Sequence, residues 1–145
     1  MASTACEKPQ NFTTTVEVAH VQRFGSDPKA PSLIDLELLF PDCGADVQRL
    51  IRLDKKFAEC VGPIKAGDKL TAQIALSWNR EKGSYRSDFT KIGACEAKAD
   101  QTDEANYELV QVCKDLVATG ATVGTHCDRS RPKALLEKCP FLRRK

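Results

Sequence analysis

The chain has 145 residues, of which 41% are hydrophobic and 29% charged, and its formal net charge is +2. This length and balance predict one globular domain and exclude a disordered chain. The net charge is too small for the entire protein surface to attract nucleic acid. No stretch approaches the roughly 18 apolar residues needed to span a bilayer.

The first part of the chain predicts a tether followed by strands. Residues 1–10 are polar, so we expect a disordered tether ahead of a single β-rich domain over residues 11–145. Residues 13–21 are β-branched and nearly alternating, which predicts a strand with a bulge near Ala19. Residues 33–40 alternate between apolar and other side chains and predict a second strand.

Two readings are open for residues 45–61. Their apolar positions fit helical spacing, but a strand followed by a short helix over residues 56–60 fits better. The glycine and proline that follow predict a break in the chain before the next element.

A β-hairpin is the clearest predicted element. Residues 69–78 and 84–92 alternate on either side of a turn. The phase of the first strand places Trp78 on the same face as Ile74 and Leu76, so we expect Trp78 to belong to the core.

The last third of the chain is less regular. Residues 107–119 fit either a helix or a strand, and residues 121–127 predict a strand after a glycine. Residues 133–138 predict a short helix capped near Ser130 and ended before Pro140. Together the elements predict a mainly β fold: a five- to six-stranded antiparallel barrel, OB-like, with one or two short helices and disulfide cross-links.

The cysteines predict disulfide bonds and an extracytoplasmic location. No pair has the C-x-x-C spacing of a redox centre, a zinc ribbon or haem attachment. Scattered cysteines are typical of exported proteins, so we expect three disulfides between sequence neighbours. The predicted pairs are Cys43–Cys60, Cys95–Cys113 and Cys127–Cys139. The alternatives are buried free thiols, or a zinc site drawn from Cys113, His126, Cys127 and Cys139.

The remaining cysteine, Cys6, is a candidate for lipidation. Small residues precede it, as at the end of a bacterial lipobox, and a lipid there would be the protein's only link to a membrane. The alternative is a free or intermolecularly paired thiol. Because Met1 is followed by no apolar run, we expect that any export signal has been removed.

No pattern predicts catalytic, cofactor-binding or metal-binding residues. Of the two histidines, His20 falls within a strand, and His126 precedes Cys127 although a catalytic thiolate needs a base placed across space. Asp35 and Glu37 alternate along one strand, where solvation explains them. No nucleotide-binding, zinc-protease or calcium-loop motif occurs.

Two features suggest binding. An OB-like barrel with basic and aromatic residues around its hairpin would suit single-stranded nucleic acid. Those residues are Trp78, Arg80, Lys82, Tyr85 and Arg86. The basic C-terminal region is a candidate interaction surface for a protein. Its residues are Arg129, Arg131, Lys133, Arg143, Arg144 and Lys145.

Three segments carry a resemblance: the Cys43/Cys60 region, residues 79–85, and the ending from His126 to Phe141. Together they resemble uncharacterised small cysteine-containing proteins of myxobacteria, many of them lipoprotein-like. The resemblance implies a bacterial envelope location and no particular activity. We therefore expect a non-enzymatic periplasmic or envelope module that binds a protein or a second copy of itself. The alternatives are a nucleic-acid-binding domain and an enzyme of unrecognised type.

Overall fold

The computed structural model describes residues 8–27, 30–100 and 103–145, and in them the chain forms one antiparallel sheet. The strand order is β6-β5-β4-β1-β2-β3-β7-β8. In chain order the elements are β1 (Gln10–Phe24), β2 (Leu33–Leu39), the 3-10 turn η1 (Pro41–Cys43), β3 (Asp46–Asp54), α1 (Lys55–Val61), β4 (Lys69–Asn79), β5 (Ser84–Ile92), β6 (Cys95–Glu96), β7 (Tyr107–Ala118), β8 (Ala121–Asp128), α2 (Lys133–Lys138) and η2 (Pro140–Leu142).

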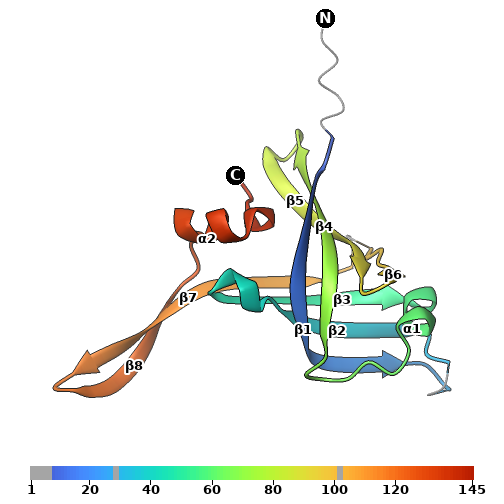
Figure 1. The fold of residues 1–145 in the computed structure, drawn as a ribbon, viewed down its shortest axis with the longest axis horizontal. Coiled ribbons are helices and arrows are strands. Elements are labelled where there is room, and N and C mark those ends of the chain that lie inside the picture. The colour runs from blue at the N-terminus through green and yellow to red at the C-terminus, as the bar shows by residue number, and fades with distance from the viewer. Residues whose placement is uncertain (1–7, 28–29, 101–102) are drawn as a thin grey trace, which may run out of the picture.

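β1 divides the sheet into two wings. Its first half, from Gln10 to Glu17, pairs with β4, and its second half, from Glu17 to Phe24, pairs with β2. The register of the second ladder shifts between Val18 and His20, which confirms the predicted bulge. The strands of the two wings run across each other in Figure 1, so that their inner faces enclose the core.

The sheet is open, and the predicted OB-like barrel of five to six strands is wrong. Its ends are β6 and β8, and no backbone ladder joins β5 to β3 or β7 in the described residues. Instead the guanidinium of Arg49, on β3, bridges the wings: its Nη1 lies 2.9 Å from Ser87 Oγ and its Nη2 2.7 Å from Ser87 O on β5. At Arg49 the backbone of β3 already pairs with Leu38 of β2 and with Glu108 of β7, so it has no free edge to pair with β5, and β7 runs on past β3 to pair with β8.

Aromatic side chains join the wings inside the core. Phe40, after β2, lies 6.0 Å from Phe89 of β5, measured between ring centroids. The ring of Phe141 in η2 lies 5.7 Å from Phe40, and Leu135 of α2 is also buried. The C-terminal helices therefore cover one end of the core. Trp78 extends beyond that core and is 38% exposed, so its predicted burial is wrong.

The helices follow local signals in part. Residues 46–61 form a strand and then a helix, as predicted, and the Asp54 side chain caps α1 by accepting a hydrogen bond of 3.0 Å from the amide of Phe57. α2 is confirmed, but its N-cap is Pro132 without a side-chain cap, so the predicted cap at Ser130 is wrong.

Three disulfides are present, and the predicted pairing of sequence neighbours is wrong. Cys43 pairs with Cys139, Cys60 with Cys95 and Cys113 with Cys127. The first attaches the C-terminal helices to η1, and the second attaches α1 to β6. These bonds join elements that lie together in the fold across 96 and 35 residues, a proximity that chain spacing does not reveal.

Candidate functional site

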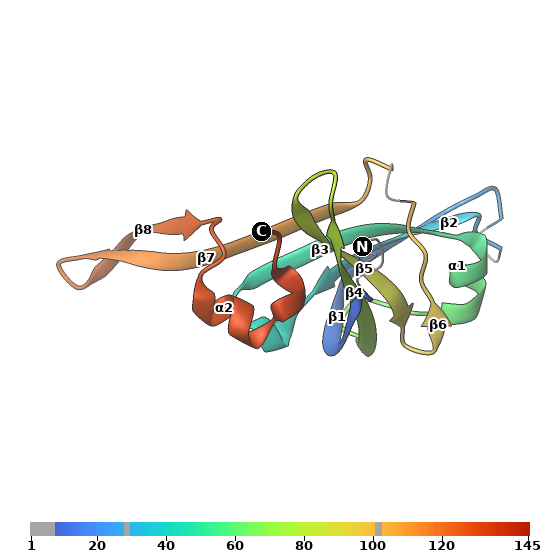
Figure 2. The same ribbon diagram turned by 90° about the horizontal axis from the view of Figure 1, so that it is seen from above.

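A two-stranded arm projects from the body of the protein. We define the arm as residues 112–128, the part of β7 beyond its pairing with β3, together with β8. Figures 1 and 2 show it extending away from the rest of the sheet. Apart from Val112 and Gly124, which are half-buried, every residue of the arm is exposed. The arm therefore holds its shape without help from the core.

Two local features stabilise the hairpin conformation of the arm: a disulfide near its base and a tight turn at its tip. The disulfide between Cys113 and Cys127 joins directly opposed residues near its base, with the Cα atoms 4.1 Å apart. At the tip, Thr119 and Gly120 have φ angles of 51° and 80°, as a type I′ hairpin turn requires at both central positions. Thr119 is the one non-glycine residue with a positive φ in the described chain, and a β-branched residue is strained there.

Exposed apolar side chains gather in the outer half of the arm. Leu116, Val117 and Val123 are 50%, 64% and 66% exposed. Leu116 pairs with Gly124 and Val117 with Thr122, so Val123 is an extra, bulged residue between them. The three side chains thus occupy neighbouring positions on a hairpin that is cross-linked by the Cys113–Cys127 disulfide.

A cluster of charged and polar side chains lies where the wings meet, away from the arm. The carboxylate of Glu108, on β7, is approached by three guanidinium groups: Arg144 at 2.5 Å, Arg131 at 2.8 Å and Arg49 at 3.8 Å. The hydroxyl of Ser87 accepts hydrogen bonds from both Arg49 and Arg144. We call these five residues the Glu108 cluster. It has more positive than negative charge.

Burial and repulsion act on the pKa values of this cluster. Desolvation lowers the pKa of Arg49, Glu108 raises it, and the neighbouring Arg144 lowers it again. Desolvation likewise lowers the pKa of Arg144, Glu108 raises it, and Arg131 lowers it. An arginine keeps its charge under such conditions, so the positive charge of the cluster persists.

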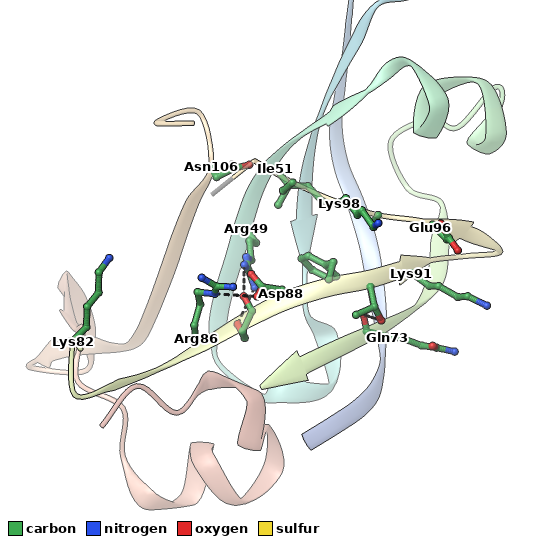
Figure 3. A pocket seen from close by; sticks show the side chains of 15 residues that line it. Arg49, Ile51, Gln73, Lys82, Arg86, Asp88, Lys91, Glu96, Lys98 and Asn106 are labelled. Carbon is green, nitrogen blue, oxygen red and sulfur yellow. Dashed lines mark hydrogen bonds and ion pairs between the residues drawn. The ribbon is translucent and has the colours of Figure 1, made fainter. Parts of the chain in front are cut away.

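A cleft of about 810 Å³ opens beside the cluster, between β5 on one side and β3 with the segment after β6 on the other. Figure 3 shows Arg49 and Arg86 directed toward Asp88 at its centre. Arg86 Nε lies 3.1 Å from an Asp88 carboxylate oxygen. The guanidinium of Arg49 also stacks on Phe89, with its carbon 5.0 Å from the ring centroid.

The structure divides the basic C-terminal residues into two groups. Arg131 and Arg144 belong to the Glu108 cluster, and Arg131 also donates to the carbonyl of Leu142. Arg143 is exposed and stacks on Tyr85, 4.8 Å from the ring centroid. The remaining three, which are exposed, are Arg129, Lys133 and Lys145. The predicted surface is thus partly a structural cluster.

The residues considered for catalysis or metal binding are not brought together. His20 lies on β1 and His126 on the arm. Cys127 is bonded to Cys113, so it is no free nucleophile, and all three cysteines of the zinc alternative are in disulfides. Asp35 forms a two-pronged ion pair with Arg52, with bonds of 2.8 and 3.0 Å. Within the described ranges no group of three or more His, Cys, Asp or Glu could hold a metal ion.

Sequence reasoning missed the Glu108 cluster, although a signal for it exists. Alternation along β3 places Arg49 on the same face as Val47 and Ile51, which are buried. A charge on an apolar strand face predicts a buried partner. The partners themselves, Ser87 and Glu108, come from distant strands and have no signal along the chain.

Comparisons of the chain with family models, curated proteins and solved structures gave no match. The resemblance to small myxobacterial proteins therefore stays a prediction. No helix in the described parts of the chain is long and apolar enough to cross a membrane. Three disulfides indicate an extracytoplasmic protein, because such bonds persist in oxidising compartments.

Proposed function

We propose that the protein is a non-enzymatic module of the periplasm or cell envelope that binds another protein through the arm. The observation that carries this is the disulfide between Cys113 and Cys127, which cross-links a ribbon that has almost no contact with the core. An isolated two-stranded hairpin is marginally stable in water. A disulfide that keeps this hairpin formed supports a role for the shape of the arm in binding, because a preorganised element loses less conformational entropy when it binds.

The surface of the arm favours a protein as the partner. Leu116, Val117 and Val123 offer apolar area at the outer half of the arm. Its charged side chains carry both signs, including Lys114 and Asp115, so no excess of positive charge favours nucleic acid or anionic lipid.

The partner we propose is a different chain and not a second copy. Two copies joined through β8 would form an antiparallel, two-fold symmetric ladder. The bulge at Val123 would then interrupt that ladder in both strands. A different protein can instead contact the outer half of the arm without such symmetry.

Attachment to the envelope would come from Cys6. The three disulfides use six of the seven cysteines and leave Cys6, which lies outside the described residues, as the candidate for a lipid. A mass increase on the peptide that contains Cys6, isolated from the membrane fraction of producing cells, would support this attachment. A free Cys6 thiol in that fraction would exclude it.

Photo-cross-linking in cells that produce the protein tests the role of the arm. A photoreactive amino acid is placed at Val123, at Val123 in the Cys113→Ser/Cys127→Ser variant, or at Thr71, an exposed control position on β4. We expect a discrete cross-linked adduct from position 123 and none from position 71. The yield of the adduct from position 123 should fall in the variant that lacks the Cys113–Cys127 disulfide. Equal adducts from both positions, or none from position 123, would overturn the proposal. An adduct of twice the chain's mass would identify a second copy instead.

A further inference from the structure

The cleft beside the Glu108 cluster has an unbalanced charge. Its lining contains five basic and two acidic side chains. The basic ones are Arg49, Lys82, Arg86, Lys91 and Lys98, and the acidic ones are Asp88 and Glu96. Figure 3 shows Lys82 and Lys98 on opposite sides of the central arginines, whereas Gln73 and Lys91 point away. Lys82 and Lys98 have no ion pair in the described part of the chain.

The carboxylates nearby do not neutralise this charge. Glu108 is shared among three guanidinium groups, and Asp88 is already held by Arg86 at 3.1 Å. Four arginines therefore face two carboxylates where the wings meet. The desolvation that lowers the pKa of Arg49 and Arg144 is the mark of positive charge held away from water. An anion that entered the cleft would be attracted by a larger effective charge than at an open surface.

The positive groups are also held in place. Arg49 is fixed by two hydrogen bonds to Ser87 and by stacking on Phe89. Arg86 is oriented by Asp88. Preorganised guanidinium groups bind carboxylate and phosphate oxygens with little further loss of side-chain entropy. The volume of about 810 Å³ lies within the range of small-molecule sites, and Phe89 and Ala99 contribute apolar surface to the lining.

We propose that this cleft is a binding site for a small molecule that carries a carboxylate or phosphate group. The oxyanion faces Arg49 and Arg86 between Lys82 and Lys98, and the apolar part of the molecule lies toward Phe89 and Ala99. The site uses none of the residues of the arm, so it is independent of the protein-binding role proposed above.

Nuclear magnetic resonance titration of the full disulfide-bonded chain at low salt tests the proposal. The probes are phenyl phosphate, benzoate and the uncharged benzyl alcohol. We expect saturable shifts of the amides of Ser87, Phe89 and Ala97 with at least one anion, no shift at Leu116 in the arm, and weaker binding as salt is added. Binding of phenyl phosphate alone would identify a phosphate site, and binding of benzoate alone a carboxylate site.

Matched charge variants locate the site. Lys82→Gln/Lys98→Gln is expected to weaken binding of the anion about fivefold, as two exposed charge interactions allow. The control Lys56→Gln/Lys65→Gln removes the same charge from exposed positions outside the lining and should leave the dissociation constant within about twofold. Three results would overturn the proposal: no saturable shift up to about 10 mM, equal binding of benzyl alcohol, or equal loss in the control.

Discussion

Arg49 on β3 donates one hydrogen bond to the hydroxyl of Ser87 on β5 and another to its carbonyl, at 2.9 and 2.7 Å. These two residues are 38 positions apart and belong to different wings of the sheet. The bond geometry uses both terminal nitrogens of one planar guanidinium. The open sheet therefore depends on a side-chain bridge that few other residues could form.

Replacing Arg49 by lysine is expected to destabilise the protein by about 1.5–3 kcal/mol, the contribution of hydrogen bonds to a charged group. A lysine keeps the charge but has one nitrogen and cannot reach both acceptors in the same way. The free energy of unfolding in urea measures the effect. Arg80→Lys, at the exposed tip of the β4–β5 hairpin, is the matched control and should change it by less than about 0.5 kcal/mol. Equal effects of the two substitutions would show that the bridge contributes no stability.

The Glu108→Gln variant is expected to lose about 3 kcal/mol of stability. It leaves Arg49, Arg131 and Arg144 close together without the carboxylate that holds them, and breaking a largely buried ion pair by removing one partner is costly. Thermal and urea unfolding give the measurement. The control is Glu104→Gln, an exposed position in the loop before β7, and a loss as large in this control would contradict the role assigned to Glu108.

The disulfides are expected to act on different parts of the molecule. Cys60→Ser/Cys95→Ser should lower the free energy of unfolding of the whole domain by about 3–5 kcal/mol, because this bond closes a loop of 35 residues between packed elements. Cys113→Ser/Cys127→Ser should leave that value nearly unchanged, because the arm is exposed and can open by itself. Amide hydrogen exchange should instead become faster within residues 112–128 alone. Loss of protection throughout the body would contradict the independence of the arm.

The turn at the tip of the arm is expected to tolerate glycine better than threonine. Thr119→Gly removes a β-branched side chain from a positive φ of 51°, a strain of about 1 kcal/mol, and should increase amide protection near the tip. Gly120→Ala places a side chain at a φ of 80° and should reduce it. If both substitutions shift protection in the same direction, the turn does not have the backbone conformation described.

Local patterns predicted most strands and two of the helices. Alternation predicted β2 from residues 33–40 and β4 from residues 69–78, because side chains in a strand point to opposite faces with a period of two. The interrupted alternation near Ala19 predicted the bulge in β1. Scattered cysteines likewise predicted disulfides. Periodicity could not settle residues 107–119, since most of β7 lies outside the core and has no buried face to impose a pattern.

Contacts between distant residues lie beyond the reach of such patterns. The pairing of Cys43 with Cys139 spans 96 residues, and the convergence of three arginines on Glu108 joins two strands and the C-terminal region. Whether a sheet closes depends on which edges meet, and here both sides of β3 are occupied by β2 and β7, so β3 reaches β5 through the Arg49 side chain and not through its backbone. Alternation reports only which face of its own strand a side chain occupies, whereas these features arise when the chain folds and brings separate faces together.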